Sequence, residues 1–227
     1  MTVVSIESTQ SAVKGLDSRE IRRNVLTTVM SLRLQHKLDK RERLRRAAFE
    51  LFTERGFDAT TTKAVAERAG VATGTVFLYA KDKADLLFLV MHDRLASTVD
   101  DRFATLPKGP LLDRLMHVFA GIFAMYGEHP AIAIAFVREL PGAKGTNADQ
   151  VNALTFAFLH RIAGLVREAQ DQGELAPSIE PLRAATNVFT LYFGALLGWI
   201  SGFTTLEAAL EPGLRSSLAL QIRGLLP

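Results

Sequence analysis

Cysteine is absent from the 227-residue chain, and long apolar runs are scarce. Without thiols the chain can form neither disulfides nor thiolate-ligated metal sites, and nothing in its composition points to secretion. Residues 1–35 contain no apolar core of signal-peptide length. The most apolar stretch, Val188–Phe203, is interrupted by Thr, Gly and Ser and falls short of the roughly 18 residues that indicate a membrane span. We therefore predict a buried helix there.

Sequence motifs of the common enzyme classes are also missing. The chain has no Gly-x-Ser-x-Gly elbow, no phosphate-binding glycine loop and no His-Glu-x-x-His helix. Its five histidines form no convincing ligand cluster. These absences argue against an enzyme, and we expect neither a metal nor another cofactor.

Basic charge is concentrated near the N-terminus. Residues 1–81 hold 15 Lys and Arg against 9 Asp and Glu, a balance of +6, whereas the remainder holds 12 against 15, a balance of −3. This asymmetry indicates a polyanionic partner for the N-terminal third, although an ordinary solvated surface has the same composition.

The first 38 residues have the least interpretable pattern. Residues 1–17 are predicted to be a polar tail, so that the extension over 1–38 is partly disordered. From Ser18 to Leu38, apolar residues recur with helical spacing among basic ones. This segment suits an arm that folds on DNA, a marginal helix, or upstream sequence preceding a true start at Met30, and the pattern does not choose among them.

The signal sharpens in the next segment, where a first helix is predicted. Asp39 and Glu42 form a capping-box pair at its start, and Gly56 suits the left-handed residue that ends it. One apolar face repeats at helical spacing in between. This face consists of Leu44, Ala47, Ala48, Leu51 and Phe52.

Two short helices and a longer one are predicted to follow. The run Thr60–Thr62 offers N-caps for a helix that Gly70 ends, and a third helix is predicted over 73–79. Asp82 caps a fourth helix, which stops before Pro107. Short helices around a tight glycine turn form the helix-turn-helix plan, although another three-helix bundle would have the same periodicity.

The helical period continues beyond Pro107, and Pro and Gly residues mark its breaks. These breaks predict an all-α body. The predicted helices cover 110–127, 130–139, 148–172, 181–202 and 213–226.

A series of spaced residues runs through the segments RERLRRAAFELFTERGFDATT and KAVAERAGVATGTVFLYAKDKADLL. It comprises Thr60, Thr61, Ala69, Gly70, Val71, Gly74, Tyr79, Lys83, Leu86 and Leu87. On these positions residues 40–87 resemble the DNA-binding domain of the TetR family of bacterial transcriptional regulators. Ala72, Leu78 and Ala80 depart from the residues that this family commonly has. The rest of the chain is similar to the family only in size and helical pattern.

The resemblance implies a transcriptional regulator, usually a repressor, that binds a palindromic operator in double-stranded DNA as a cytoplasmic homodimer. A small, largely apolar effector of unspecified identity would release it, and no membrane partner is expected. A three-helix DNA-binding domain over 39–87 would follow the extension, and a larger helical domain for effector binding and dimerisation would cover 88–227. The alternative is a helical ligand-binding dimer with weakened or lost DNA-binding function.

In such a domain the third helix enters the major groove. Gly74 lets its backbone approach the DNA, and neighbouring threonines can bond base edges or pack against thymine. Lys63 is the main candidate for a base contact, with a phosphate contact or a solvated lysine as alternatives. Tyr79 and Lys83 are phosphate candidates, and a core role is the alternative for Tyr79. The predicted DNA-binding set is Arg41, Thr61, Thr62, Lys63, Thr73, Gly74, Thr75, Tyr79 and Lys83.

The C-terminal part is rich in aromatic residues, most of which are expected in the core. By resemblance, a subset should line a mostly apolar effector pocket with a few polar groups. The predicted pocket residues are Phe119, Phe123, Tyr126, Phe136, Phe156, His160 and Tyr192.

Three glycines recur every fourth residue on one predicted apolar helix. Each sacrifices about 1 kcal/mol of helix propensity relative to alanine, which is understandable where another helix approaches closely. By resemblance, the last two helices pair with those of a second subunit, so a twofold dimer is predicted over about 181–226. Packing within one subunit, or space for a ligand, is the alternative. The predicted interface residues are Gly194, Gly198, Gly202, Leu218 and Ile222.

Overall fold

The computed structural model describes residues 18–226, with side chains from Leu32 onward. It divides into two units, Met1–Arg43 and Leu44–Pro227, and each is described by itself. Within the described range, every regular element is helical, as the sequence predicts. The predicted polar tail over 1–17 lies outside the described residues.

Helix α2 (Ser18–Arg55) corrects the predicted start of the first helix. Asp39 lies inside this helix, where its carboxylate is 3.8 Å from the guanidinium of Arg43 as an i,i+4 ion pair. The capping-box prediction is therefore wrong. Its physical reason is that no Pro or Gly interrupts the span, so helix propagation prevails over the local capping signal. The segment from Ser18 to Leu38 is helical, and its use as a DNA arm stays a prediction.

The head of the second unit contains the end of α2, then α3 (Thr62–Ala69), α4 (Thr73–Val76) and the first turn of α5 (Lys83–Ala104). The predicted inward face of α2 is confirmed, since its five residues are at most 3% exposed. The inner face of α3 is likewise buried through Val65, Ala66 and Ala69. These faces belong to the buried core of the second unit.

The boundaries of these helices follow the predicted local chemistry. Gly56 and Gly70 adopt φ angles of +79° and +65°, the left-handed conformation that ends a helix. The Thr61 hydroxyl accepts the N–H of Ala64 at the start of α3, and the Asp82 carboxylate accepts the N–H of Asp85 at the start of α5. Helix α4 is shorter than predicted and continues beyond Val76 as hydrogen-bonded turns.

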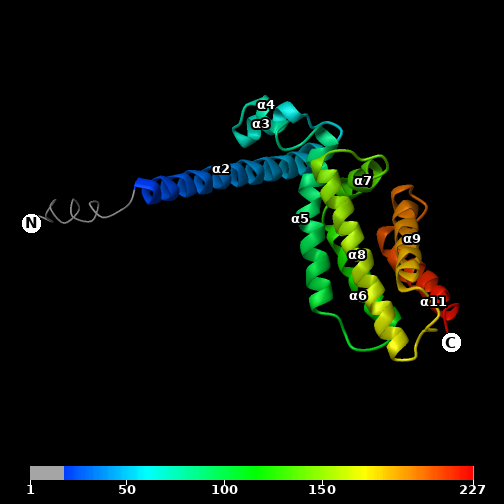
Figure 1. Cartoon of the computed structure of the whole chain (residues 1–227). Helices are drawn as coiled ribbons and strands as arrows, with labels where there is room; N and C mark the ends of the chain where they lie inside the picture. The colour runs from blue at the N-terminus through cyan, green and yellow to red at the C-terminus, as the bar shows by residue number, and fades with distance from the viewer. Residues whose placement is uncertain (1–17, 227) are drawn as a thin grey trace, which may run out of the picture. The chain divides into compact units, whose positions relative to one another are not determined.

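The body consists of longer helices that Figure 1 shows running alongside one another, with α5, α6 and α8 in mutual contact and α9 packed on α8. Its elements are α6 (Leu111–Glu128), α7 (Pro130–Glu139), α8 (Thr146–Asp171), α9 (Pro181–Ile200), α10 (Leu206–Ala208), η1 (Ala209–Leu214) and α11 (Arg215–Arg223). Helix α5 begins in the head and continues into the body, where it contacts α6, α7 and α8. One continuous apolar core joins both parts.

The end of α9 differs from the prediction. Gly202 lies beyond the helix with φ at +76°, and the N–H of Phe203 donates to the carbonyl of Gly198 at 3.0 Å. This bond closes the helix C-terminus. Gly202 therefore ends the helix instead of extending a row of close-packing glycines, so only Gly194 and Gly198 share a face of α9.

Among the described residues, no single helix is long and apolar enough to cross a membrane. Taken together, helices α6 and α7 have the length and apolar composition of a membrane span, but the chain bends by 111° between them.

Candidate DNA-binding head and effector cavity

The outward side of α3 and α4 carries the central part of the predicted DNA-binding set. The Lys63 side chain is 76% exposed, and its ammonium lies 3.9 Å from Glu67 on the next turn. Thr73 and Gly74 are exposed at the start of α4. A Cβ added at Gly74 would meet no heavy atom within 4 Å, so the backbone at this glycine is open to an approaching molecule.

The three threonines at the start of α3 have different structural roles. Thr60 is buried, and its hydroxyl donates to the carbonyls of Leu51 and Gly56 at 3.2 and 2.8 Å, which ties the loop to the end of α2. Thr61 is the exposed N-cap. Thr62 is half-buried as the first residue of the helix.

Lys83 has structural partners inside the head. Its ammonium donates to the carbonyls of Phe57 and Asp58 at 2.9 and 3.0 Å and lies 4.5 Å from the centre of the Phe57 ring. These contacts hold the start of α5 against the loop after α2. Its predicted phosphate contact therefore competes with a structural role that the sequence did not reveal.

Arg68 similarly joins α3 to α2. Its guanidinium donates to Glu50 at 3.2 Å and to both carboxylate oxygens of Glu54 at 2.9 Å. The hydrogen bond with Glu54 raises the pKa of Arg68 and lowers the pKa of the Glu54 carboxyl. The remaining predicted DNA contact, Arg41, lies before Leu44 in the unit described separately.

A buried joint connects the head to α8. Asp85 is 1% exposed. One carboxylate oxygen accepts the backbone N–H groups of Asn147 and Ala148 at 3.0 Å, and the second accepts the backbone N–H of Lys81 at 2.9 Å. The Asn147 side-chain amide donates to this second oxygen at 3.2 Å and to the carbonyl of Tyr79 at 2.8 Å. Helix α8 is thereby bonded directly to the turn that follows α4.

The close packing of this joint is visible at Gly145. A Cβ at that position would lie 2.5 Å from the Asp85 carboxylate carbon, and Gly145 has a φ of +134°. Tyr79 is half-buried and packs against the hydrophobic core, the contact expected if this tyrosine has a core role. Neither Asp85 nor Asn147 was predicted, because the two residues lie 62 positions apart and neither belongs to a local motif.

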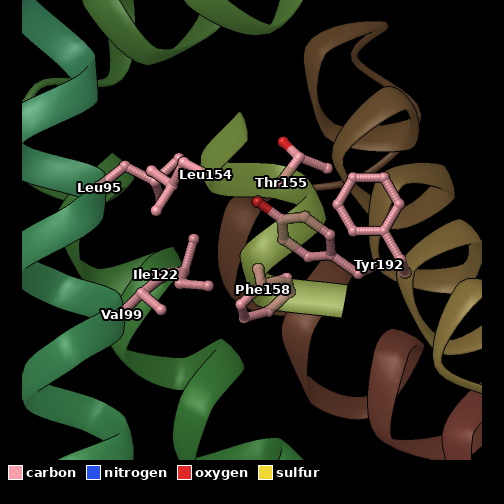
Figure 2. Close-up of a pocket in the computed structure, with 8 residues that line it drawn as sticks. Leu95, Val99, Ile122, Leu154, Thr155, Phe158 and Tyr192 are labelled. Atoms are coloured by element: carbon pink, nitrogen blue, oxygen red, sulfur yellow. The ribbon is translucent and has the colours of Figure 1, made fainter. Parts of the chain in front are cut away.

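Figure 2 shows a small apolar cavity in the body, into which the hydroxyl of Tyr192 points. Its volume is about 30 Å³. The lining comes from α5, α6, α8 and α9 and consists of Leu95, Val99, Ile122, Leu154, Thr155, Phe158, Phe189 and Tyr192. Of the seven predicted pocket residues, Tyr192 alone lines this cavity.

Two of the other predicted aromatic residues pack against Tyr192, and the remaining ones do not line the cavity. Phe119 stacks on Tyr192 with ring centres 5.0 Å apart, and Phe123 meets the same ring edge-on. Phe136 packs in the core. Phe156 and His160 are wrong as pocket residues, because the inward face of α8 passes through Phe158, and these two side chains are exposed on the other side.

Tyr126 and Tyr192 bring two hydroxyl groups into this apolar region. The two oxygens are 3.2 Å apart, and both rings are buried. Burial raises the pKa of Tyr126 to about 12 and raises the pKa of Tyr192 well above its ordinary value. Both hydroxyls therefore remain protonated near neutral pH and can donate a hydrogen bond.

Some of the residues predicted for the dimer interface are exposed on the surface of the subunit. Gly194 is exposed on α9, and Leu197 and Leu220 are 41% and 69% exposed on α9 and α11. Leu218 is fully buried within its own subunit, so its prediction as an interface residue is wrong: it faces the core. Ile222 is half-buried. A groove of about 370 Å³ between these helices is lined by Leu191, Ser217, Leu220, Gln221, Gly224 and Leu225.

Comparison with protein-family models identifies the head. Residues 44–90 match the model described as bacterial regulatory proteins of the tetR family. These residues include the end of α2, the two short helices and the first turns of α5. This segment is a TetR family DNA-binding domain.

Relatives extend the likeness into the body. The chain is 23% identical over 155 residues to a fatty acid metabolism regulator protein of Bacillus subtilis, covering 68% of this chain and 80% of that one. It is 24% identical over 163 residues to the transcriptional repressor KstR of Rhodococcus jostii, covering 72% and 74%. A crystal structure of Thermus thermophilus FadR, a TetR family repressor in complex with lauroyl-CoA, matches with TM-score 0.67 and 28% identity over 82% and 95% of the chains.

These findings confirm a helical DNA-binding transcriptional regulator and not an enzyme. Within the described part of the chain, no group of three or more His, Asp or Glu residues is arranged to hold a metal ion. The individual DNA, effector and dimer contacts stay predictions.

Proposed function

We propose that this TetR family member is a cytoplasmic repressor that binds a palindromic operator as a homodimer and is released by a long-chain acyl thioester. Residues 39–87 form its DNA-binding domain, and residues 88–227 bind the effector and the second subunit. The observation that carries this proposal is the arrangement of α8. The N-terminal end of this helix is bonded to the head through Asn147, and its middle lines the cavity through Leu154 and Phe158.

The effector class follows from the relative with the bound lauroyl-CoA and from the chemistry of the cavity. The lining is almost entirely apolar, which suits an acyl chain. One hydroxyl of the Tyr126–Tyr192 pair donates to the other, and the second hydroxyl is left as a hydrogen-bond donor for a carbonyl oxygen. An apolar lining with a few polar groups is typical of small-molecule sites.

Entry of an acyl chain requires a larger cavity than the one lined by these residues. A cavity of about 30 Å³ has room for a single water molecule, whereas ligand sites enclose roughly 300 to 1,000 Å³. An acyl chain must therefore separate α8 from α5, α6 or α9 to enter. Because the same helix holds Asp85 and Tyr79, this movement would tilt the head and change the distance between the two heads of a dimer.

This change would weaken DNA binding because the half-sites of an operator lie about 34 Å apart or at multiples of that spacing. An effector that prefers the tilted conformation shifts the population away from the DNA-bound one. In this proposal, helices α5 and α8 are the two elements that connect the cavity to the DNA-binding head.

The first test is DNA binding itself. The purified chain is titrated against DNA from upstream of its own gene in a mobility-shift series at increasing salt. We expect binding that weakens with salt, because neutralised phosphates release counterions. Lys63→Ala should lower the affinity, and it should reduce the slope of log affinity against log salt by about 1 if Lys63 contacts a phosphate.

Lys108→Ala is the matched control, because Lys108 is an exposed lysine in the loop between α5 and α6. Equal losses of DNA affinity in the two variants would show that Lys63 makes no specific contact with DNA. If neither the upstream DNA nor any duplex selected from a random pool is bound, the alternative holds, and the chain is a helical ligand-binding dimer without DNA-binding function.

A further inference from the structure

The outward face of α4 and of the turn after it carries neither a charged nor an amide side chain. Residues 73–80 contain no Arg, Lys, Asn, Gln, Asp or Glu. Leu78 is 78% exposed and Phe77 is 54% exposed, whereas Val76 and Ala80 point into the core. Neighbouring large apolar side chains left on a surface are typical of an interaction site.

Hydrogen bonds keep this face in helical register past the end of α4. The N–H of Leu78 donates to Thr75, and the N–H of Tyr79 donates to Val76, at 3.1 and 2.9 Å. These bonds join residues three positions apart, as in a 3₁₀ turn, so Phe77 follows Gly74 by one turn and Leu78 follows Thr75. The bare backbone at Gly74 permits a close approach, and a groove that receives it also meets the exposed side chains of Phe77 and Leu78 close by.

The face is continuous with the DNA-binding surface that the family match covers. In the major groove, thymine alone of the four bases presents a methyl group, and an apolar side chain can recognise it without a hydrogen bond. Against the other base edges, the same side chain would cover polar groups without pairing them, which is unfavourable. The partner chemistry that fits this face is a row of thymine methyl groups.

We propose that Leu78, with Phe77 beside it, is a specificity-determining residue that reads thymine methyl groups in the operator. This proposal rests on the proposed DNA-binding function. In this proposal an apolar contact discriminates between base pairs, whereas recognition helices commonly use Arg or Asn for this purpose. The half-site should accordingly contain thymine at the positions facing α4, and its symmetry mate should repeat them.

The test uses a duplex that the whole chain selects from a random pool. Each thymine of the selected half-site is replaced by deoxyuridine, which lacks only the methyl group and pairs identically. At the position that Leu78 reads, we expect the affinity to fall about fourfold, the factor contributed by one buried carbon. Replacing the thymine in both half-sites should lower the affinity roughly fifteenfold, if the half-sites act independently.

The variant Leu78→Ala tests whether the Leu78 side chain makes the contact with the thymine methyl group. The variant should bind the thymine duplex more weakly than the wild type and should bind the thymine and deoxyuridine duplexes equally well. Leu78→Met keeps an apolar side chain and should retain sensitivity to the methyl group. Because Leu78 is exposed, these changes leave the core intact, and thermal melting verifies this. Phe156→Ala removes a side chain that is 65% exposed on α8 and should behave as the wild type.

Equal wild-type affinity for the thymine and deoxyuridine duplexes would overturn the thymine readout while leaving DNA binding established. The same conclusion would follow if Leu78→Ala lost affinity but kept the wild-type ratio between the two duplexes. Failure to select any duplex would reject the proposed function together with this inference.

Discussion

The ammonium group of Lys83 lies between the carbonyls of Phe57 and Asp58, over the face of the Phe57 ring. A cation in this position stabilises the loop after α2 by charge-assisted hydrogen bonds. Its place near the start of α5 also suits a phosphate contact, so loss of DNA binding in a Lys83 variant would have two explanations. For this reason Lys63 is the better residue for testing DNA contact.

We predict that Lys83→Met destabilises the protein. Loss of the two hydrogen bonds should lower the free energy of unfolding by about 1 to 2 kcal/mol. Lys81→Met is the control, because Lys81 is exposed and contributes only its backbone N–H to the Asp85 joint. Thermal melting without DNA separates the two variants. Equal melting temperatures would show that the Lys83 contacts contribute nothing to stability.

The buried hydroxyls of Tyr126 and Tyr192 predict a loss of stability at alkaline pH. Burial raises the pKa of Tyr126 from 10.0 to about 12 and raises that of Tyr192 in the same direction. The unfolded chain therefore ionises first, so the contribution of these groups is complete below pH 10 and is lost as the pH rises through about 12.

A Tyr126→Phe, Tyr192→Phe double variant should lose less stability over this interval than the wild type, as measured by denaturant unfolding at each pH. Tyr79→Phe is the control and should keep the wild-type dependence. An identical alkaline loss in the double variant would mean that other groups cause it.

At the scale of elements, α8 is the helix on which the proposed coupling depends. Asn147→Ala removes the side-chain bonds to Tyr79 and Asp85 but leaves the backbone N–H groups at the helix start in place. We predict that this variant still binds DNA but responds less to the effector. The measurement is the ratio of DNA affinities without and with lauroyl-CoA.

Asn152→Ala is the matched control, because it changes an exposed asparagine on the same helix. It should keep the wild-type ratio of affinities. An unchanged ratio in Asn147→Ala would show that the bonds of the Asn147 side chain play no part in coupling.

The elements that the sequence predicted correctly are those with local causes. Gly56, Gly70 and Asp82 mark helix ends through their own backbone or side-chain chemistry, and the inward faces follow from spacing alone. The start at Asp39 failed because a capping residue also tolerates the middle of a helix when nothing interrupts propagation. The part of the site that depends on pairing between distant elements, such as Asp85 with Asn147, left no local signal.

The side of a helix on which a residue lies is a second limit. Phe156 and Phe158 are two positions apart on α8, yet one is 65% exposed and the other is 5% exposed. Leu218 was predicted as an interface residue because the resemblance pairs the last two helices with a second subunit, but its side chain faces its own core. Composition identified an aromatic body, whereas the packing of α8 against α5 and α6 determines which aromatic residues approach a ligand.

At the scale of the whole molecule, the exposed apolar side of α9 and α11 predicts a homodimer. Leu220→Asp places a charge on this surface and should shift the mass in sedimentation from twice 24.9 kDa towards 24.9 kDa. Phe156→Asp is the control, because Phe156 is about as exposed but lies on α8. Dissociation by Phe156→Asp with no effect of Leu220→Asp would place the interface on a different surface.

The central claim is that an acyl thioester and DNA are coupled through this fold. The direct measurement is fluorescence anisotropy of a labelled operator duplex titrated with the protein, in lauroyl-CoA or in free CoA at the same concentration. We expect lauroyl-CoA to weaken DNA binding by about 5- to 150-fold, the usual range of such coupling, and free CoA to have no effect. Unchanged DNA affinity at a lauroyl-CoA concentration that calorimetry shows to saturate the protein would contradict the coupling, and absence of lauroyl-CoA binding would contradict the effector class.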